Sequence, residues 1–173
     1  MKRLLVVVDM QNDFITGSLG TPEAQAIVPN VKAKIEEYKA NGDEIIFTRD
    51  THNADYLETQ EGKRLPIKHC INGTWGWIIA DEVNYPEYKH INKPTFGCKF
   101  LEHYIDKDEI YQIELVGLCT DICVVSNALI LKAIYPEMFM VVDADCCAGT
   151  TPEKHVAALE TMKSCQIAVI GEY

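Results

Sequence analysis

The sequence predicts an α/β fold built on a parallel sheet, and three kinds of observation support this fold class. Apolar runs rich in β-branched residues recur along the chain, as in strands that are covered on both faces. Segments with apolar residues at helical spacing lie between these runs. Strands that alternate with helices form parallel sheets with right-handed connections. Because 173 residues also suit one core, we expect a single domain over residues 1–173.

The pattern places the strands and the first helix. Five runs are expected to be strands: 4–8, 44–48, 110–116, 139–143 and 167–170. A helix over 27–41 is expected to end at Asn41-Gly42, a pair that suits a C-cap. Residues 49–108 show poor periodicity apart from a short helix near 100–105, and so long a segment between strands is usually functional.

Two further helices are predicted from their start and stop signals. Asp121 is expected to cap a helix over 123–134, which Pro136 ends. The Thr-Thr-Pro-Glu sequence that starts at Thr150 offers a capping box for a helix that reaches residue 164. Strands and helices therefore alternate over most of the chain.

Composition excludes several classes of partner. The chain carries 16 basic and 26 acidic residues, a formal net charge of −10, and the basic residues do not cluster, so a nucleic-acid backbone would be repelled. No apolar run approaches the roughly 20 residues that cross a bilayer, and Asp9 stops the first run too early for a signal peptide. The seven cysteines are odd in number and include no C-x-x-C pair, which disfavours a disulfide framework and a zinc ribbon. We expect a soluble, cytoplasmic protein with reduced thiols, no nucleic-acid partner and no membrane association.

Two predicted strands deliver a candidate catalytic residue at their carboxyl end, where chemistry collects in parallel sheets. Asp9 follows an all-apolar strand, where the exclusion of water can shift the pKa of its carboxyl to suit proton transfer. The alternative is an Asx turn or a helix cap. Cys123 starts a predicted helix, whose dipole and free N–H groups favour a thiolate and an oxyanion site. The alternative is a buried thiol that packs the helix against the sheet. Gly117 favours the functional interpretation because it permits a close approach of backbone to a ligand.

The long segment adds two further candidates. Lys93, followed by Pro94, can hold a neighbouring carboxylate ionised and stabilise a developing anion, although by itself it is typical of a surface lysine. Asp50, His52 and, further along, His69 offer mixed nitrogen and oxygen ligands for Zn²⁺, Mn²⁺ or Fe²⁺. The carboxylates between these histidines are Asp55, Glu58 and Glu61.

Together these segments resemble one known family. Its motifs occur in the expected order: D-x-Q-N-D-F from Asp9, Lys-Pro at Lys93, and G-x-x-T-D-x-C-V from Gly117. Over residues 4–170 the chain resembles the cysteine hydrolases of the isochorismatase-like superfamily. Its D-x-H segment and the H-C-I-N-G-T segment from His69 are most similar to the nicotinamidases. The resemblance implies a three-layer, Rossmann-like fold, in which helices flank a six-stranded parallel sheet.

The resemblance also assigns roles to individual residues. The implied catalytic triad is Asp9, Lys93 and Cys123. A cis peptide bond is implied between Leu118 and Cys119, and the backbone amides of Cys119 and Cys123 are implied to form the oxyanion hole. Phe14 and Leu118 are implied to line the substrate pocket.

A divalent metal that binds the ring nitrogen of the substrate is implied as well. Its implied ligands are Asp50, His52, His69 and Glu61, with Glu58 and Asp55 as alternatives to Glu61. Zinc is the expected metal, and manganese and iron are alternatives. One departure concerns the substrate ring: nicotinamidases place Trp or Phe shortly before the last metal histidine, whereas residues 64–68 are Arg-Leu-Pro-Ile-Lys. One aromatic wall is then missing, unless Trp75 or Trp77 reaches the site.

These assignments imply nucleophilic acyl transfer, in which Asp9 accepts the thiol proton and Cys123 attacks an amide carbonyl. The expected enzyme is a nicotinamidase-like hydrolase of carbon–nitrogen bonds other than peptide bonds, and relatives are often oligomers. One alternative is a relative that hydrolyses another amide, a ureido or carbamoyl group, or an enol ether, although isochorismatases lack the nucleophilic cysteine. A non-catalytic thiol protein that senses redox state or binds a partner is the third interpretation, motivated by the adjacent Cys146 and Cys147.

Overall fold

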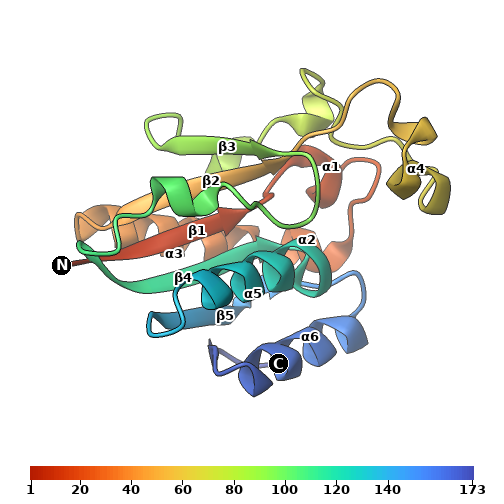
Figure 1. Ribbon diagram of the computed structural model, residues 1–173. Helices are drawn as coiled ribbons and strands as arrows, with labels where there is room; N and C mark the ends of the chain where they lie inside the picture. Colours follow the sequence, from red (N-terminus) through yellow and green to blue (C-terminus); the bar gives the residue numbers. More distant parts are fainter.

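The computed structural model describes all 173 residues and contains one six-stranded sheet (Figure 1). Its strands are β1 (Lys2–Val8), β2 (Glu44–Asp50), β3 (Lys89–Lys93), β4 (Ile110–Leu118), β5 (Phe139–Ala148) and β6 (Ala168–Ile170). They lie in the order β3-β2-β1-β4-β5-β6, and every neighbouring pair is parallel. The six-stranded parallel sheet that the resemblance implied is therefore confirmed.

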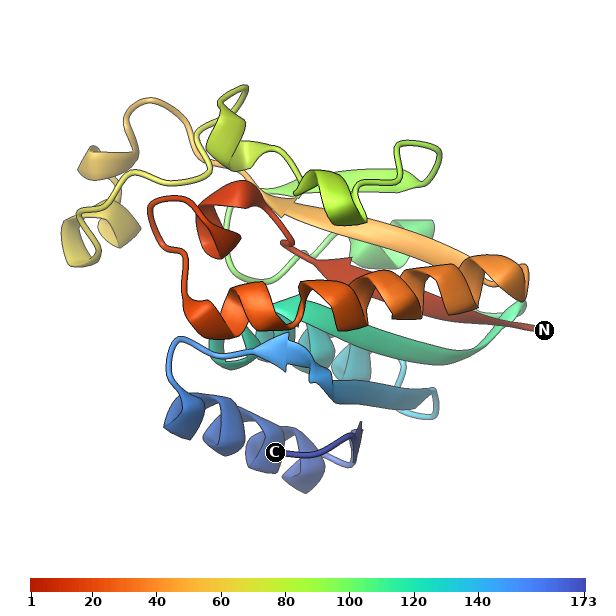
Figure 2. The ribbon, with the colours of Figure 1, turned by 180° about the vertical axis from the view of Figure 1, so that it is seen from behind.

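Helices cover both faces of the sheet. The α-helices are α1 (Asn12–Ile15), α2 (Pro22–Ala26), α3 (Val28–Ala40), α4 (Gln60–Arg64), α5 (Val125–Ile134) and α6 (Pro152–Ser164). Short helical turns are η1 (Tyr56–Glu58), η2 (Trp75–Trp77), η3 (Asp81–Val83), η4 (Leu101–Tyr104) and η5 (Thr120–Val124). Figures 1 and 2 show α5 in front of one face and α3 on the other. None of these helices combines the length and the apolar composition needed to span a membrane.

Each face of the sheet has its own apolar core, because side chains alternate along a strand. In β1, Leu4 and Val6 belong to the core that also contains Leu131 of α5. Leu5 belongs to the second core, which contains Ile35 of α3. Burial on both faces explains why this strand has a continuous apolar sequence rather than an alternating one.

Two strands differ from the sequence prediction. No strand was expected within 49–108, yet β3 lies there; it is an edge strand in which only Ile91 and Lys93 are buried, so it gives no apolar run. Strand β5 extends to Ala148 rather than to 143, and its pairing with β4 shifts register between Leu115 and Gly117. A shifted register breaks the pattern on which the sequence prediction depends.

The helix ends confirm one predicted cap and contradict another. The Thr151 side chain accepts a hydrogen bond from the backbone N–H of Lys154 and so caps α6 as expected. The prediction that Asp121 caps the helix that follows it, α5, is wrong. The Asp121 carboxylate accepts hydrogen bonds from the backbone N–H and the hydroxyl of Thr150, at 2.8 and 2.7 Å. These bonds connect the helical turn before α5 to the loop after β5.

The strand order contains a topological switch point. Strand β1 lies between β2 and β4, so the chain moves to one side of β1 first and later to the other side. In open α/β sheets, ligands bind in the crevice at the carboxyl ends of the strands that flank such a point. Asp9 follows β1, and the turn that contains Cys123 follows β4.

Candidate active site and metal cluster

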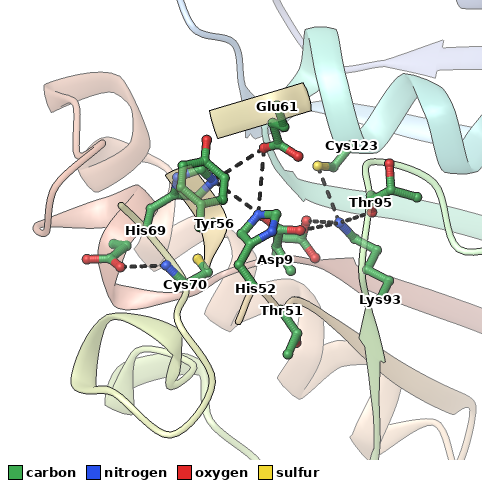
Figure 3. A network of polar contacts seen from close by, with 12 residues as sticks. Asp9, Thr51, His52, Tyr56, Glu61, His69, Cys70, Lys93, Thr95 and Cys123 are labelled. Atoms are coloured by element: carbon green, nitrogen blue, oxygen red, sulfur yellow. Dashed lines mark hydrogen bonds and ion pairs between the residues drawn. The ribbon is translucent and has the colours of Figure 1, made fainter. Parts of the chain in front are cut away.

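Asp9, Lys93 and Cys123 meet at the carboxyl ends of their strands (Figure 3). Lys93 Nζ lies 2.6 Å from Asp9 Oδ2 and 3.4 Å from Cys123 Sγ. The same ammonium group donates to the backbone carbonyl of Thr95 at 3.1 Å. The three residues are only 0%, 1% and 4% exposed, so Lys93 is not a surface lysine. One buried ammonium thus contacts both a carboxylate and a thiol.

The Asp9 carboxylate has a fixed orientation. Its Oδ1 accepts a hydrogen bond from the Thr48 hydroxyl at 2.7 Å, and its Oδ2 faces Lys93. Its backbone has a φ of 48°, in the left-handed region that a non-glycine residue rarely adopts. Both oxygens contact other strands rather than the backbone of their own turn, so the alternative of an Asx turn does not apply.

Burial and charge set the protonation of the site. Burial raises the pKa of the Asp9 carboxyl, and the charge of Lys93 opposes this effect. Burial also raises the pKa of the Cys123 thiol well above its ordinary value; the charge of Asp9 raises it further, while that of Lys93 lowers it. Burial and the charge of Asp9 thus oppose the thiolate that the helix dipole predicted, and the Asp9 carboxylate lies where it can accept the thiol proton. Cys123 lies within η5 rather than at the first residue of a helix.

The turn after β4 has the expected cis peptide bond between Leu118 and Cys119. Gly117 has a φ of 118°, and a β-carbon there would lie 2.1 Å from the carbonyl oxygen of Val8. This glycine therefore lets β4 approach β1, which explains the residue without a ligand, and the expectation that its backbone approaches a ligand stays a prediction. The oxyanion hole formed by the Cys119 and Cys123 amides stays a prediction.

A second polar cluster lies beside the first, where Asp50, His52, Glu61 and His69 each offer one oxygen or nitrogen atom to a common space. Figure 3 shows His52, Glu61 and His69 of this cluster. Asp50 Oδ2 lies 2.9 Å from His52 Nε2 and 3.5 Å from His69 Nε2. Glu61 Oε1 lies 3.6 Å from Nε2 of both histidines. Tetrahedral ligands about 2.1 Å from a zinc ion would be about 3.4 Å apart, close to these four separations. All four ligand atoms lie within 4.8 Å of one another, so they can share one small cation.

The charges within this cluster suit a divalent cation. Burial favours the neutral form of Asp50, but the neighbouring His52 and His69 side chains and the charge of Lys93 hold its pKa below the ordinary value. His69 Nδ1 donates to the carbonyl of Ile67 at 2.8 Å, which leaves the Nε2 lone pair free for a metal. The structure brings Glu61 into the cluster, while Glu58 is exposed.

Two residues that the sequence analysis did not single out hold these ligands in place. Buried Gln11 donates to the carbonyl of Asp50 at 2.8 Å and accepts from its N–H at 2.7 Å. The Asp13 carboxylate accepts from the N–H of Cys70 at 2.7 Å, directly after His69. Both residues belong to the D-x-Q-N-D-F motif that starts at Asp9, so the motif itself contained the signal.

Tyr56 is another residue that the sequence analysis missed. Its buried ring lies 4.7 Å from the His52 ring and 4.9 Å from the His69 ring. Its hydroxyl donates to the carbonyl of Leu65 at 2.9 Å. Packing against both imidazoles restricts their rotation, but a single tyrosine in a short helical turn such as η1 gives no signal in the sequence.

A cavity of about 280 Å³ lies over both clusters. Cys123 and Asp50 reach its wall, and so do Phe14 and Leu118, as expected for the substrate pocket. The remaining apolar lining includes Leu19, Leu65, Phe96 and Ile122. The nucleophile, the cation-binding atoms and an apolar wall thus share one space.

The aromatic walls of this cavity differ from those considered in the sequence analysis. Trp75 is 59% exposed, and the Trp77 ring lies under the Arg49 guanidinium at 4.0 Å; neither lines the cavity. Phe96, from the loop after β3, does line it together with Phe14. A second aromatic wall is therefore present, but from a different segment.

Residues 3–172 match the family described as "Isochorismatase domain". The chain belongs to this family. It is similar to a nicotinamidase of Saccharomyces cerevisiae, with 22% identity over 216 residues that cover 98% of this chain and 100% of that protein. Among solved structures, a nicotinamidase/pyrazinamidase from Bacillus subtilis is similar with a TM-score of 0.85 and 29% identity, covering 99% of this chain and 100% of that one. A pyrazinamidase of Pyrococcus horikoshii in complex with zinc is similar with a TM-score of 0.83, 29% identity and the same coverage. This isochorismatase-family fold is shared over the whole chain.

Proposed function

We propose that this isochorismatase-family chain is a cysteine-dependent amidohydrolase that converts nicotinamide to nicotinate and ammonia. Family and relatives identify it as a hydrolase of carbon–nitrogen bonds other than peptide bonds. The observation that carries the proposal is the position of the Lys93 ammonium, which contacts the Asp9 carboxylate and the Cys123 thiol under one cavity. The cation-binding atoms of Asp50 and Glu61 line that same cavity.

The proposed reaction starts when the Cys123 thiol gives its proton to Asp9 and the sulfur attacks the amide carbonyl carbon. The backbone amides of Cys119 and Cys123 would then donate to the tetrahedral oxyanion. Asp9 returns the proton to the departing nitrogen, the carbon–nitrogen bond breaks, and ammonia leaves a thioester on Cys123. Asp9 next accepts a proton from water, and the resulting hydroxide attacks the thioester carbonyl. The carbon–sulfur bond breaks, Asp9 returns its proton to the Cys123 sulfur, and the carboxylic acid product loses a proton to solvent and leaves as nicotinate.

Lys93 balances the charge during this cycle. The negative charge lies on Asp9 before proton transfer and on the sulfur or the substrate oxygen afterwards. An ammonium 2.6 Å from one and 3.4 Å from the other stabilises both distributions without moving. The raised pKa of Asp9 makes its carboxylate a stronger base for the thiol proton, whereas the raised pKa of Cys123 makes that proton harder to remove, so the transfer depends on the charge of Lys93 beside the sulfur.

Asp50, His52, Glu61 and His69 would hold a divalent metal, with zinc expected and manganese or iron as alternatives. When bound, the metal supplies a Lewis-acidic site that a pyridine nitrogen can occupy. Phe14 and Phe96 give the cavity apolar faces against which an aromatic ring can pack.

Further properties beyond the reaction belong to the same proposal. We propose that residues 1–173 form one domain, since both cores are built on the same sheet. We also propose that the enzyme is cytoplasmic, acts on a small amide without a nucleic-acid or membrane partner, and forms a homo-oligomer.

A second candidate is hydrolysis of another amide, or of a ureido or carbamoyl compound. Leu65, and no aromatic residue of 64–68, lines the cavity where nicotinamidases place Trp or Phe. A less enclosed ring site favours substrates whose recognition depends less on stacking.

Ammonia release separates these candidates. Wild-type protein, Cys123→Ala and Cys165→Ala are compared on nicotinamide and on ureido compounds, each with and without added Zn²⁺ or Mn²⁺. We expect release from nicotinamide to fall at least about 10⁴-fold in Cys123→Ala. The exposed thiol of Cys165 should be dispensable. Wild-type activity in Cys123→Ala would overturn the mechanism, and activity on ureido compounds alone would replace the substrate.

A further inference from the structure

Asn127 is a fully buried polar residue of α5, one helical turn after the nucleophile, and the mechanism above does not use it. Its Nδ2 donates to the carbonyl of Cys123 at 2.8 Å and to the carbonyl of Phe96 at 3.3 Å. Its Oδ1 accepts from the N–H of Cys98 at 2.8 Å. Both amide hydrogens and the oxygen are therefore used, and every partner is backbone.

Two of these three hydrogen bonds leave the helix. They reach the loop over residues 94–98, which follows Lys93. Asn127 is the third residue of α5, which directly continues the helical turn η5, and asparagine is a weak helix former because its amide competes for backbone groups. Local preference therefore does not explain this residue. The contacts across to the loop do explain it.

The loop over 94–98 carries two parts of the site. The Thr95 carbonyl accepts from Lys93 Nζ at 3.1 Å, as Figure 3 shows, and Phe96 lines the cavity. The loop also lies directly on α5, because a β-carbon on Gly97 would come 2.4 Å from the end of the Ile130 side chain. Asn127 thus supplies the hydrogen bonds at a close contact between the loop and the helix.

We propose that Asn127 is a positioning residue, which fixes the loop over 94–98 to the nucleophile's helix and so sets the places of the Thr95 carbonyl and Phe96. Without it, Lys93 loses a fixed carbonyl partner and the cavity loses a fixed aromatic wall. The kinetic consequence rests on the proposed amidohydrolase, whereas the placement of Lys93 beside Cys123 does not.

Two variants separate the contact within the helix from the contacts to the loop. A serine hydroxyl in a helix can donate to the carbonyl four residues earlier, so Asn127→Ser can keep the contact to Cys123 and loses both contacts to the loop. Asn127→Leu, which is similar in size, loses all three. Leu131→Ala is the control, because it removes buried packing from the same helix without removing a hydrogen bond to the loop.

The first measurement is the pH midpoint of Cys123 alkylation by iodoacetamide, followed by peptide mass spectrometry with exposed Cys165 as internal reference. The charged groups that face Cys123 are Asp9, Lys93 and Asp50, and of these only Lys93 favours the thiolate. We therefore expect the midpoint to rise in both Asn127 variants. A change in access alone would alter the rate at every pH and leave the midpoint in place.

The second measurement is kcat and KM for nicotinamide. We expect kcat/KM to fall at least about 10-fold in both Asn127 variants, with a rise in KM and a fall in kcat, because small misplacements of reacting groups are costly. Leu131→Ala should lower the melting temperature and leave the midpoint and KM unchanged. An Asn127→Ser protein with the wild-type midpoint and KM would overturn the inference, and this variant decides alone if Asn127→Leu does not fold. If the wild type does not hydrolyse nicotinamide, the proposed function fails, and the alkylation midpoint still tests the role of Asn127.

Discussion

Two lysines in this protein, the partly buried Lys34 and the buried Lys93, each contact two carboxylates, and only Lys93 lies at the proposed catalytic site. Lys34 of α3 lies 2.9 Å from Glu114 Oε1 and 2.8 Å from Asp143 Oδ2. Lys93 lies 2.6 Å from Asp9 Oδ2 and 3.7 Å from Asp50 Oδ1. In both clusters the attraction of the acids outweighs burial and raises the pKa of the lysine.

The two clusters differ in what surrounds them. The Tyr38 hydroxyl donates to Glu114 at 2.6 Å and completes the Lys34 cluster, none of whose members lines the cavity over Cys123. Lys93 instead faces a thiol, and its weaker partner Asp50 points to the cation-binding cluster. Buried charge pairs therefore do not identify a catalytic site; the adjoining nucleophile and cavity do.

Neutralising each lysine in turn gives the largest expected contrast. Lys93→Met should lower kcat by about 10³-fold, because proton transfer between Cys123 and Asp9 loses its balancing charge. Lys34→Met should leave kcat unchanged but lower the free energy of unfolding by about 3 kcal/mol, since Glu114 and Asp143 stay buried without a partner. Steady-state kinetics and urea unfolding of both variants measure the contrast. Equal losses of kcat in the two variants would contradict it.

Removing a metal ligand should have the next largest effect. Glu61→Ala should weaken Zn²⁺ binding about 10- to 100-fold, because Glu61 contacts both histidines of the cluster. Glu58→Ala is the matched control, since Glu58 is exposed and lies outside the cluster. Competition with a chelator measures the affinity of each variant. Equal affinities would remove Glu61 from the proposed ligand set.

The acidic midpoint of kcat/KM should also differ between variants of the two clusters, with a smaller effect than the losses above. Asp9 must be ionised to accept the thiol proton, and burial raises its pKa, so activity should be lost on acidification at a midpoint above the ordinary value of about pH 4. Lys93→Met should move this midpoint higher still, because the charge of Lys93 lowers the pKa of Asp9. Lys34→Met should leave it in place. A midpoint that responds equally to both variants would show that it does not report Asp9.

The smallest expected effect is the loss of stability at alkaline pH that follows deprotonation of Lys34. Hydrogen bonds to Asp143 and Glu114 outweigh burial and raise the pKa of Lys34 in the folded state. Its contribution is therefore fully present below the unfolded pKa of about 10.4 and is lost as pH rises towards the folded value. Urea unfolding at several pH values above 10 should show a loss of about 1 kcal/mol per pH unit from this group. The slope should be shallower in Lys34→Met, and an unchanged slope would contradict the assignment.

The predictable part of the fold is the part with regular burial. Strand β1 is covered on both faces, so its apolar run predicted both the strand and the position of Asp9 at its end. Strand β3 is an edge strand with alternating exposure, and its Lys93 is buried only because it pairs with buried acids. Such a lysine resembles a surface residue in sequence, so the family resemblance, and not periodicity, identified it.

The candidate site also contains residues that the sequence pattern predicted and residues that only the tertiary structure brings in. Asp50 and His52 are neighbours at a strand end and could be found by spacing, whereas Glu61 reaches them from α4 through tertiary structure. Phe96 and Asn127 gave no signal, because their roles depend on how the loop after β3 lies on α5. The helix-dipole argument for a Cys123 thiolate left out burial and the charge of Asp9, both of which raise the pKa of this thiol and depend on tertiary structure.

The most direct test of the account is to trap the acyl-enzyme. Wild-type protein turning over nicotinamide is quenched with acid, and peptide mass spectrometry locates any added nicotinoyl group. The account predicts one nicotinoyl group on Cys123, which is absent from the quenched Cys123→Ala protein. Steady turnover with no adduct on Cys123, or with the adduct on another residue, would contradict it.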